Sequence, residues 1–290
     1  MMSTAAAEAE TIVNTALAGI GEIATLPQIT VRIIETVENP KSTARDLHEI
    51  IKNDPALSSK ILKVVNSAFY GLPGKIGTID RAIVLLGLSA VKNIAIAASI
   101  TRLFKGSQLT GEFTAKDLWT HSLSVAVVSR MLHKEMFSQG GDDVFLAGLI
   151  HDLGILTIRQ AFPEKLVEII NRVSAGTEDY CEVESEILGA DHQAFGAGLA
   201  GKWKFPRHLR AAVGYHHNPD ELAEDSRRLA MVVQLADIIC CKAKIGFDLT
   251  SRNKQLQQEH LDAVGVTPDQ VGEILQQFPD QLSVADGMLG

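Results

Sequence analysis

Apolar residues recur at steps of three and four along most of the chain, which is the spacing of an amphipathic α-helix. Ile33, Ile34 and Val37 form one such stripe, which would face a core. A longer stripe predicts a helix from Asp117 to Met136. A convincing two-residue alternation of apolar and polar positions, the signature of a half-buried strand, is not found. The pattern therefore predicts an all-α fold with about a dozen helices.

Helix-start signals support this prediction at several points. Asp54 stands directly before Pro55, which combines a capping residue with a proline at the first helical position and predicts a helix that continues to Val65. The segment Thr267–Gln270 combines the same signal with a capping box. We expect this second helix to continue to Gln277.

The most hydrophobic stretch of the chain, residues 82–100, raises the question of a membrane span. A spanning helix needs about 20 apolar residues with few or no charges, and Lys92 and Asn93 interrupt this stretch near its middle. Two buried helices with a break near residues 87–89 are the better interpretation. Residues 1–10 lack the basic and apolar regions of a signal peptide. We therefore expect a cytoplasmic protein that does not contact the membrane.

Composition narrows the classes of protein further. The chain has 290 residues, of which 46% are hydrophobic, enough for a packed core and too many for general disorder. With 35 acidic against 27 basic residues the formal net charge is −8, which argues against DNA or an anionic membrane as the partner. The three cysteines (Cys181, Cys240 and Cys241) have no CxxC spacing, which disfavours a disulfide scaffold or a thiolate zinc site.

Seven histidine and aspartate residues carry the candidate chemistry, because each falls in or beside an apolar helical segment where it needs a partner. They are His121, His151, Asp152, His192, His216, His217 and Asp237. Neighbouring helical residues point about 100° apart, so His151 and Asp152 could hold one metal ion together with His121 and Asp237. The remaining histidines could hold a second ion, with Asp152 as the bridge.

Imidazole and carboxylate ligands suit divalent Fe, Mn, Zn or Ni, one or two ions per chain. Two such ions about 3.5–4 Å apart would activate a water molecule and stabilise charge on a phosphoryl group. The same side chains could instead form a buried hydrogen-bonded network without metal, and the sequence leaves both interpretations open. His121 is the weakest member of the set, since a lone histidine on an apolar helix is more often a core residue. The other four histidines are expected at the surface: His48, His133, His208 and His260.

Two other segments are better explained by structure than by function. Residues 66–71 are expected to end a helix and to form a turn, with Phe69 and Tyr70 as anchors, rather than a recognition loop. Trp203 is expected to pack inside a helical hairpin with the neighbouring lysines in solvent, rather than to contact a nucleotide.

The order His, His-Asp, His, His-His, Asp is similar to that of the HD superfamily of metal-dependent phosphohydrolases, and more narrowly the chain resembles the HDOD family of HD-related output domains. The resemblance runs from about residue 23 to residue 245. It is carried by LPQIT at 26–30, IIKNDPALSSKILKVVNSAFYG at 50–71, IDRAIVLLGL at 79–88, and the later segments LWTHSL, AGLIHDLG, GKWKFP and YHHNP.

The resemblance implies an N-terminal helical bundle packed on an HD-type helical bundle, with the boundary between Phe104 and Phe113. The expected parts are an N-terminal extension (1–22), an N-terminal helical subdomain (23–107), an HD-like subdomain (108–245) and a C-terminal helical extension (246–290). It also implies a bacterial signalling role. In this role the chain would be a regulatory output module that acts on a signalling protein partner, with the metal site retained in its HD-like half.

The alternative implied by the resemblance is a metal-dependent phosphodiesterase that acts on a cyclic dinucleotide or another nucleotide phosphoester. The active HD-GYP relatives carry a lysine after the HD pair that meets the substrate phosphate, whereas here HDLG is followed by Ile155. Their GYP loop is also missing. Lys202, Arg207 and Arg210 are the only candidates near in sequence for a phosphate-binding cation. A di-iron redox or gas sensor would use the same ligands and has no separate support.

Overall fold

The computed structural model describes residues 4–21, 26–104, 109–110, 112–136 and 141–289. Within these residues the chain is helical and contains no extended strand, which confirms the predicted all-α fold. The helices are α1 (Thr4–Gly19), α2 (Gln28–Glu38), α3 (Ala44–Ile51), α4 (Pro55–Val65), α5 (Ile79–Leu86), α6 (Leu88–Ile100), α7 (Ala115–Met136), α8 (Asp142–Ile150), α9 (Leu153–Ala161), α10 (Pro163–Ala175), α11 (Tyr180–Leu188), α12 (His192–Lys202), α13 (Arg207–Tyr215), α14 (Glu224–Lys242), α15 (Gln258–Val264) and α16 (Pro268–Leu289). Two short 3-10 helices, η1 (Thr101–Phe104) and η2 (Pro219–Glu221), complete the set.

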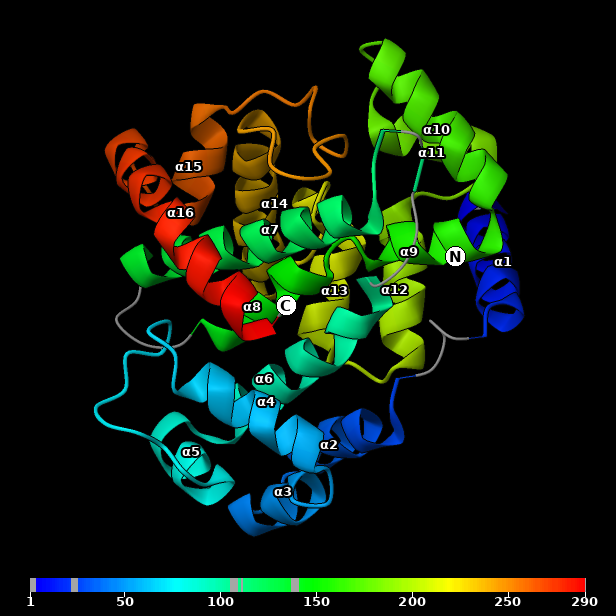
Figure 1. The fold of residues 1–290 in the computed structure, drawn as a ribbon. Helices are drawn as coiled ribbons and strands as arrows, with labels where there is room; N and C mark the ends of the chain where they lie inside the picture. The colour runs from blue at the N-terminus through cyan, green and yellow to red at the C-terminus, as the bar shows by residue number, and fades with distance from the viewer. Residues whose placement is uncertain (1–3, 22–25, 105–108, 111, 137–140, 290) are drawn as a thin grey trace.

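Helices α2 to α6 form a bundle at the bottom of Figure 1, where α6 packs on α2, α4 and α5. The predicted starts are confirmed, because the side chain of Asp54 accepts a hydrogen bond from the backbone N–H of Leu57 and caps α4. The predicted break in the hydrophobic stretch is also confirmed, since Gly87 has φ +88° and separates α5 from α6. Lys92 lies buried on α6 and forms an ion pair with Glu38 at 3.2 Å.

Helix α7 is the centre of the second bundle, where it packs on α8, α14 and α16, while α12 packs on α9 and α13. The two bundles meet where α6 contacts α8. There the Asn93 side chain donates a hydrogen bond of 2.7 Å to Asp143. The predicted boundary between the bundles lies partly at residues 105–108 and 111, outside the described residues. The exact limits of the four predicted parts stay a prediction.

The flanking segments pack on the bundles. Helix α1 lies against α12 and α9, and α16 crosses α7 and reaches α4 (Figure 1). The predicted end of α16 at Gln277 is wrong, because the helix continues past Pro279 to Leu289. Ala285 and Leu289 are buried against the core, and this packing outweighs the hydrogen bond that an internal proline removes.

One stretch in the described part of the chain, Asp143–Ala161, is long and apolar enough to cross a membrane by length and composition. However, 83% of that window is buried inside the protein. The stretch is also divided into α8 and α9 by the turn at His151 and Asp152. Such burial is typical of the core of a folded bundle.

Candidate metal centre

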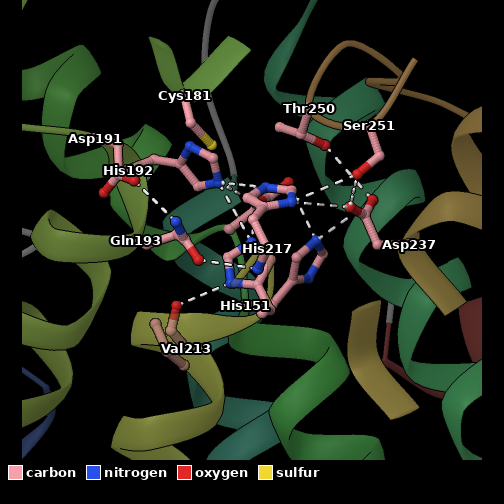
Figure 2. A network of polar contacts seen from close by, with 12 residues as sticks. His151, Cys181, Asp191, His192, Gln193, Val213, His217, Asp237, Thr250 and Ser251 are labelled. Carbon is pink, nitrogen blue, oxygen red and sulfur yellow. Dashed lines mark hydrogen bonds and ion pairs between the residues drawn. The ribbon is translucent and has the colours of Figure 1, made fainter. Parts of the chain in front are cut away.

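The seven histidine and aspartate side chains singled out in the sequence come together in one cluster, which we call the histidine–aspartate cluster. Figure 2 labels four of them, His151, His192, His217 and Asp237. They come from α7, the turn between α8 and α9, the start of α12, the two residues that follow α13, and the middle of α14. Six of them have no exposed surface, and His217 is 4% exposed. Their role as metal ligands remains a prediction.

Two glycines allow the helices that carry the cluster to approach closely. A Cβ atom on Gly148 of α8 would lie 2.8 Å from the Cα atom of Ala126 on α7. A Cβ atom on Gly154 of α9 would lie only 1.8 Å from the carbonyl oxygen of His192 at the start of α12. Both glycines flank the His151–Asp152 turn, so these contacts set its distance from the other cluster residues.

One side of the cluster joins His121, His151 and Asp237. The Nε2 atom of His121 lies 3.1 Å from Oδ1 of Asp237 and 3.6 Å from Oδ2 of Asp152. The Nε2 atom of His151 lies 3.2 Å from the same Oδ2 atom and 4.0 Å from Oδ1 of Asp237. The ligand atoms of the three residues are within 4.8 Å of one another, close enough to share an ion.

The other side joins His192, His216 and His217 to the second oxygen of Asp152. Oδ1 of Asp152 lies 3.3 Å from Nε2 of His192 and 3.6 Å from Nε2 of His216. Nε2 of His192 is also 3.1 Å from Nε2 of His217. Asp152 therefore stands between the two sets with one oxygen toward each, a position from which one carboxylate can bridge two ions.

The outer ring nitrogens of three histidines are held by hydrogen bonds. Nδ1 of His151 donates to the carbonyl of Gly148 at 2.7 Å, and Nδ1 of His216 donates to the carbonyl of Val213 at 2.8 Å. Nδ1 of His192 lies 2.6 Å from Oε2 of Glu184. In a neutral imidazole, a proton on Nδ1 leaves the lone pair on Nε2. When the rings are neutral, these partners would therefore direct lone pairs into the cluster, as outer hydrogen bonds do at metal sites.

Unpaired buried atoms test whether a metal would fit. Both ring nitrogens of His121, Nε2 of His151 and both carboxylate oxygens of Asp152 are buried and form no well-aligned hydrogen bond, although several of these atoms lie within ion-pair distance of one another. Buried polar atoms are seldom left without a hydrogen bond, and a bound ion is one way in which a protein satisfies them. The donor set is nitrogen and oxygen, which suits Fe, Mn, Zn or Ni. The residues present therefore fit a metal centre.

The electrostatics of the cluster are dominated by burial and by the two aspartates. Burial alone would raise the pKa of Asp152, but the neighbouring histidines, His151 first, lower it well below its usual value. Burial lowers the pKa of His216 to about 4, so this ring is neutral at neutral pH. Burial opposes protonation of His192 as well, but the charge of Glu184 raises its pKa to about 10. A metal ion would have to displace that proton in order to bind His192.

Sequence reasoning missed three polar residues that hold the cluster. Glu184 of α11 accepts the backbone N–H of His192 at 2.8 Å in addition to its contact with the ring. Ser251 donates to Oδ2 of Asp237 at 2.5 Å, and Thr250 lies 3.5 Å from Oδ1 (Figure 2). A signal existed for Glu184, because it shares the buried spacing of Tyr180, Val183 and Leu188 on α11. None existed for the two residues of the loop after α14.

The packing predicted for residues 66–71 and for Trp203 is confirmed. Asn66 ends α4, and its side chain exchanges two hydrogen bonds with the backbone of Ile76, at 2.7 and 2.6 Å. Phe69 packs edge-on against Phe145, with ring centroids 5.3 Å apart. Trp203 is 2% exposed, while the flanking lysines are exposed.

The candidate phosphate-binding cations serve other parts of the molecule. Lys202 donates to the carbonyl of Leu17 at the end of α1. Arg210 lies against Gly201, and Arg207 lines a separate cleft. A different cation, Lys254, acts on the cluster. The pKa of His217 is lowered first by burial, then by the charge of His216, and then by the charge of Lys254.

The four histidines expected at the surface are half-buried or exposed. Among them, His48 lies 2.6 Å from Asp80, and His208 lies 3.3 Å from Asp143. The histidine–aspartate cluster thus contains all the fully buried histidines of the described chain.

Comparison with known proteins places this geometry in context. A family model of the HDOD domain matches residues 23–219. A crystal structure of an HDOD domain protein of unknown function from Geobacter sulfurreducens superposes with a TM-score of 0.79 at 22% identity, over 98% of this chain and 99% of the other. A protein of Shewanella amazonensis SB2B, provisionally named a phosphohydrolase, gives a TM-score of 0.74 at 27% identity, over 96% and 98% of the two chains.

A relative in Treponema pallidum (strain Nichols), described as an uncharacterized protein, is 26% identical over 220 residues. The match covers 76% of this chain and 42% of the relative, so this chain spans less than half of that protein's length. The likeness to the Geobacter structure shows a shared fold over almost the whole chain.

Proposed function

The chain belongs to the HDOD family, a regulatory family of signalling proteins, and from this premise we propose that it is an output module that acts by contacting another signalling protein. Its histidine–aspartate cluster would hold one or two divalent metal ions that set the state of the HD-like bundle. The three cysteines are free, which suits action in a reducing cytoplasm.

The observation that carries this proposal is the burial of the cluster. A metal-dependent phosphohydrolase must bring a phosphoryl group and a water molecule to its ions. Here every candidate ligand is buried, with His217 the most exposed at 4%. In addition, Ile155 stands where the HD-GYP enzymes carry their phosphate-binding lysine, and it is buried in α9. This burial supports a role in holding ions over a role in catalysis, because the candidate ligands offer almost no accessible surface to a phosphoester.

The residues that would hold the ions are the two sets joined by Asp152. When bound, the ions would supply positive charge that compensates Asp152 and Asp237 and bonds that link the helices around them. The chain's own part is to orient the rings through Gly148, Val213 and Glu184. Burial excludes water from the site.

The alternative is a metal-dependent phosphodiesterase or other phosphohydrolase. What favours it is the oriented set of seven ligands with a carboxylate between two groups. The Shewanella protein provisionally named a phosphohydrolase also shares the fold along nearly its full length. An enzyme of this kind would require the loop after α14, which carries Ser251 and Lys254, to move and open the cluster.

The test is metal content by elemental analysis, on the full chain purified without chelator or nickel resin. We expect close to two ions per chain, and fewer than one in Asp152→Asn. The surface variant His48→Ala is the matched control and should keep the full content. No bound metal, even after iron and manganese are supplied without oxygen, would overturn the metal site.

Hydrolysis of a cyclic dinucleotide with added manganese separates the two functions. We expect no turnover by the loaded protein. Turnover that disappears in Asp152→Asn and persists in His48→Ala would overturn the output module in favour of the enzyme.

A further inference from the structure

A second candidate site lies away from the histidine–aspartate cluster, where α16 crosses α7. It is a cleft of about 350 Å³, which we call the α7–α16 cleft. Its walls are α7, α16 and the loop of residues 68–71 that follows α4. Pockets of about 300–1,000 Å³ are the usual size for small-molecule sites. The cleft is therefore large enough for a small ligand, and its lining residues are separate from the cluster.

An arginine in the wall of the cleft has unused hydrogen-bonding capacity. The guanidinium carbon of Arg130 on α7 lies 4.0 Å from the ring centroid of Phe69 and 4.7 Å from that of Tyr70. These contacts attract the positive charge but supply no hydrogen-bond acceptor to the N–H groups. Nη1 of Arg130 is buried, and within the described chain it has no hydrogen-bond partner. Since buried N–H groups seldom lack an acceptor, Arg130 is placed to bind an acceptor that enters the cleft.

Helix α16 is held on α7 by a polar contact at each end of the crossing. The side chain of Gln270 donates to Oε2 of Glu135 at 3.3 Å, and Nε1 of Trp119 donates to Oδ1 of Asp286 at 3.2 Å. The first residues of α16 thus meet the last residues of α7, so the two helices run antiparallel. The cleft therefore lies between two anchored helices, as a preformed binding site requires.

The charges that line the cleft balance one another. Arg130 and Lys134 are the cations, and Glu135 and Glu273 are the carboxylates. The lining therefore has no net formal charge, which disfavours a ligand with several negative charges, such as a nucleotide phosphate. It suits a small ligand that itself carries one carboxylate and one ammonium group.

We propose that the α7–α16 cleft binds a free amino acid with an aliphatic side chain. The carboxylate of the ligand would accept hydrogen bonds from Arg130, a pairing that guanidinium and carboxylate groups favour. The ammonium group would pair with Glu273 on the opposite helix. The aliphatic side chain would lie against Val127, Met131 and Ile274, which form the apolar part of the lining.

The experiment is calorimetric titration of the full chain with L-leucine, after metal removal with a chelator. We expect saturable binding. Two matched compounds each lack one of the charges: 4-methylpentanoate has no amino group and 3-methylbutylamine has no carboxylate. Each should bind at least tenfold more weakly than L-leucine, a difference of about 1.4 kcal/mol.

Two variants assign the binding to the cleft. Arg130→Met keeps an apolar side chain against the aromatic rings and should bind L-leucine at least tenfold more weakly, by about 1.4 kcal/mol. Glu273→Gln changes an exposed residue, so it should fold like the parent and remains a test even if Arg130→Met does not fold. It should weaken the binding of L-leucine and leave that of 4-methylpentanoate unchanged. Glu168→Gln, at an exposed position of α10, is the matched control and should bind L-leucine like the parent.

Absence of saturable binding up to millimolar L-leucine would overturn the proposal. Equal binding by the parent and by both cleft variants would do so too, because the ligand would then sit elsewhere. Equal affinity of the parent for L-leucine and for 4-methylpentanoate would remove the ammonium contact, and with it the assignment of an amino acid. None of these results depends on the metal centre or on the output role, so a failure here would leave both of those proposals standing.

Discussion

Replacement of Gly154 by alanine is the most direct test of how the histidine–aspartate cluster is held together. The added Cβ atom would lie 1.8 Å from the carbonyl oxygen and 2.7 Å from the carbonyl carbon of His192. Both are backbone atoms, so no side chain can rotate away. Restoring an ordinary van der Waals contact would separate α9 from α12 by roughly 1.5 Å. We expect a loss of about 3 kcal/mol in the free energy of unfolding, at the upper end for overpacked cores.

The assay is urea unfolding of Gly154→Ala and the parent, together with metal content. The displacement would move Asp152 and His192 apart, so metal binding should fall along with stability. Gly272→Ala is the control, because Gly272 lies within α16 with open space around the added atom. It should gain about 0.5–1 kcal/mol, as glycine is a poor residue inside a helix. A Gly154→Ala protein within about 0.5 kcal/mol of the parent would refute the close packing of α9 on α12.

Three further changes probe other parts of the structure. Glu184→Ala removes the hydrogen-bond acceptor of His192, and we expect it to lower metal affinity roughly 10–100-fold in a chelator competition assay. Glu184→Gln keeps an acceptor and should lower the metal affinity less. Asn66→Ala removes both hydrogen bonds to Ile76 and should cost about 2 kcal/mol in urea unfolding; no loss would contradict the anchoring of that loop. The hydrogen bond from His208 lowers the pKa of Asp143 from 3.8 to about 2. The ionised Asp143 therefore stabilises the folded state fully above about pH 4, and this stabilisation is lost as the pH falls toward the pKa that Asp143 has in the folded protein. Because the carboxylate is partly exposed, we expect Asp143→Asn to lose about 1 kcal/mol at pH 6 and less at pH 3.

Most of the fold could be predicted because helical periodicity and caps are local properties. The start of α4 at Asp54 and the break at Gly87 need only neighbouring residues, and both are confirmed. The end of α16 could not be predicted in this way. Local preference favours a stop near Pro279, but Ala285 and Leu289 gain burial against the core. Tertiary packing decides such cases, and the sequence of the helix alone does not reveal its neighbours.

The cluster could be anticipated because a buried histidine or aspartate on an apolar helix needs a partner. The residues around it could not, because they approach from distant segments. Ser251 reaches Asp237 only after the chain has left α14 and turned back over it. Glu184 reaches His192 because α11 docks beside the start of α12. Arg207 is near the cluster in sequence but not in space. It lies only nine residues before His216, but those residues form α13, which places Arg207 at the opposite end of the helix.

In the proposed module, the burial of the cluster would make a metal ion an effective regulator. The candidate ligands come from five separate segments of the HD-like half, and Asp152 lies between the two sets, so a bound ion would link most of the helices in that half. Because such a site exists only in the folded arrangement, the free energy of metal binding adds to the free energy of folding. An ion at 100 times its dissociation constant would stabilise that arrangement by about 2.7 kcal/mol. Two conformations of a signalling module commonly differ by a few kcal/mol. A closed centre can therefore decide which surface the module presents to its partner without ever contacting a substrate.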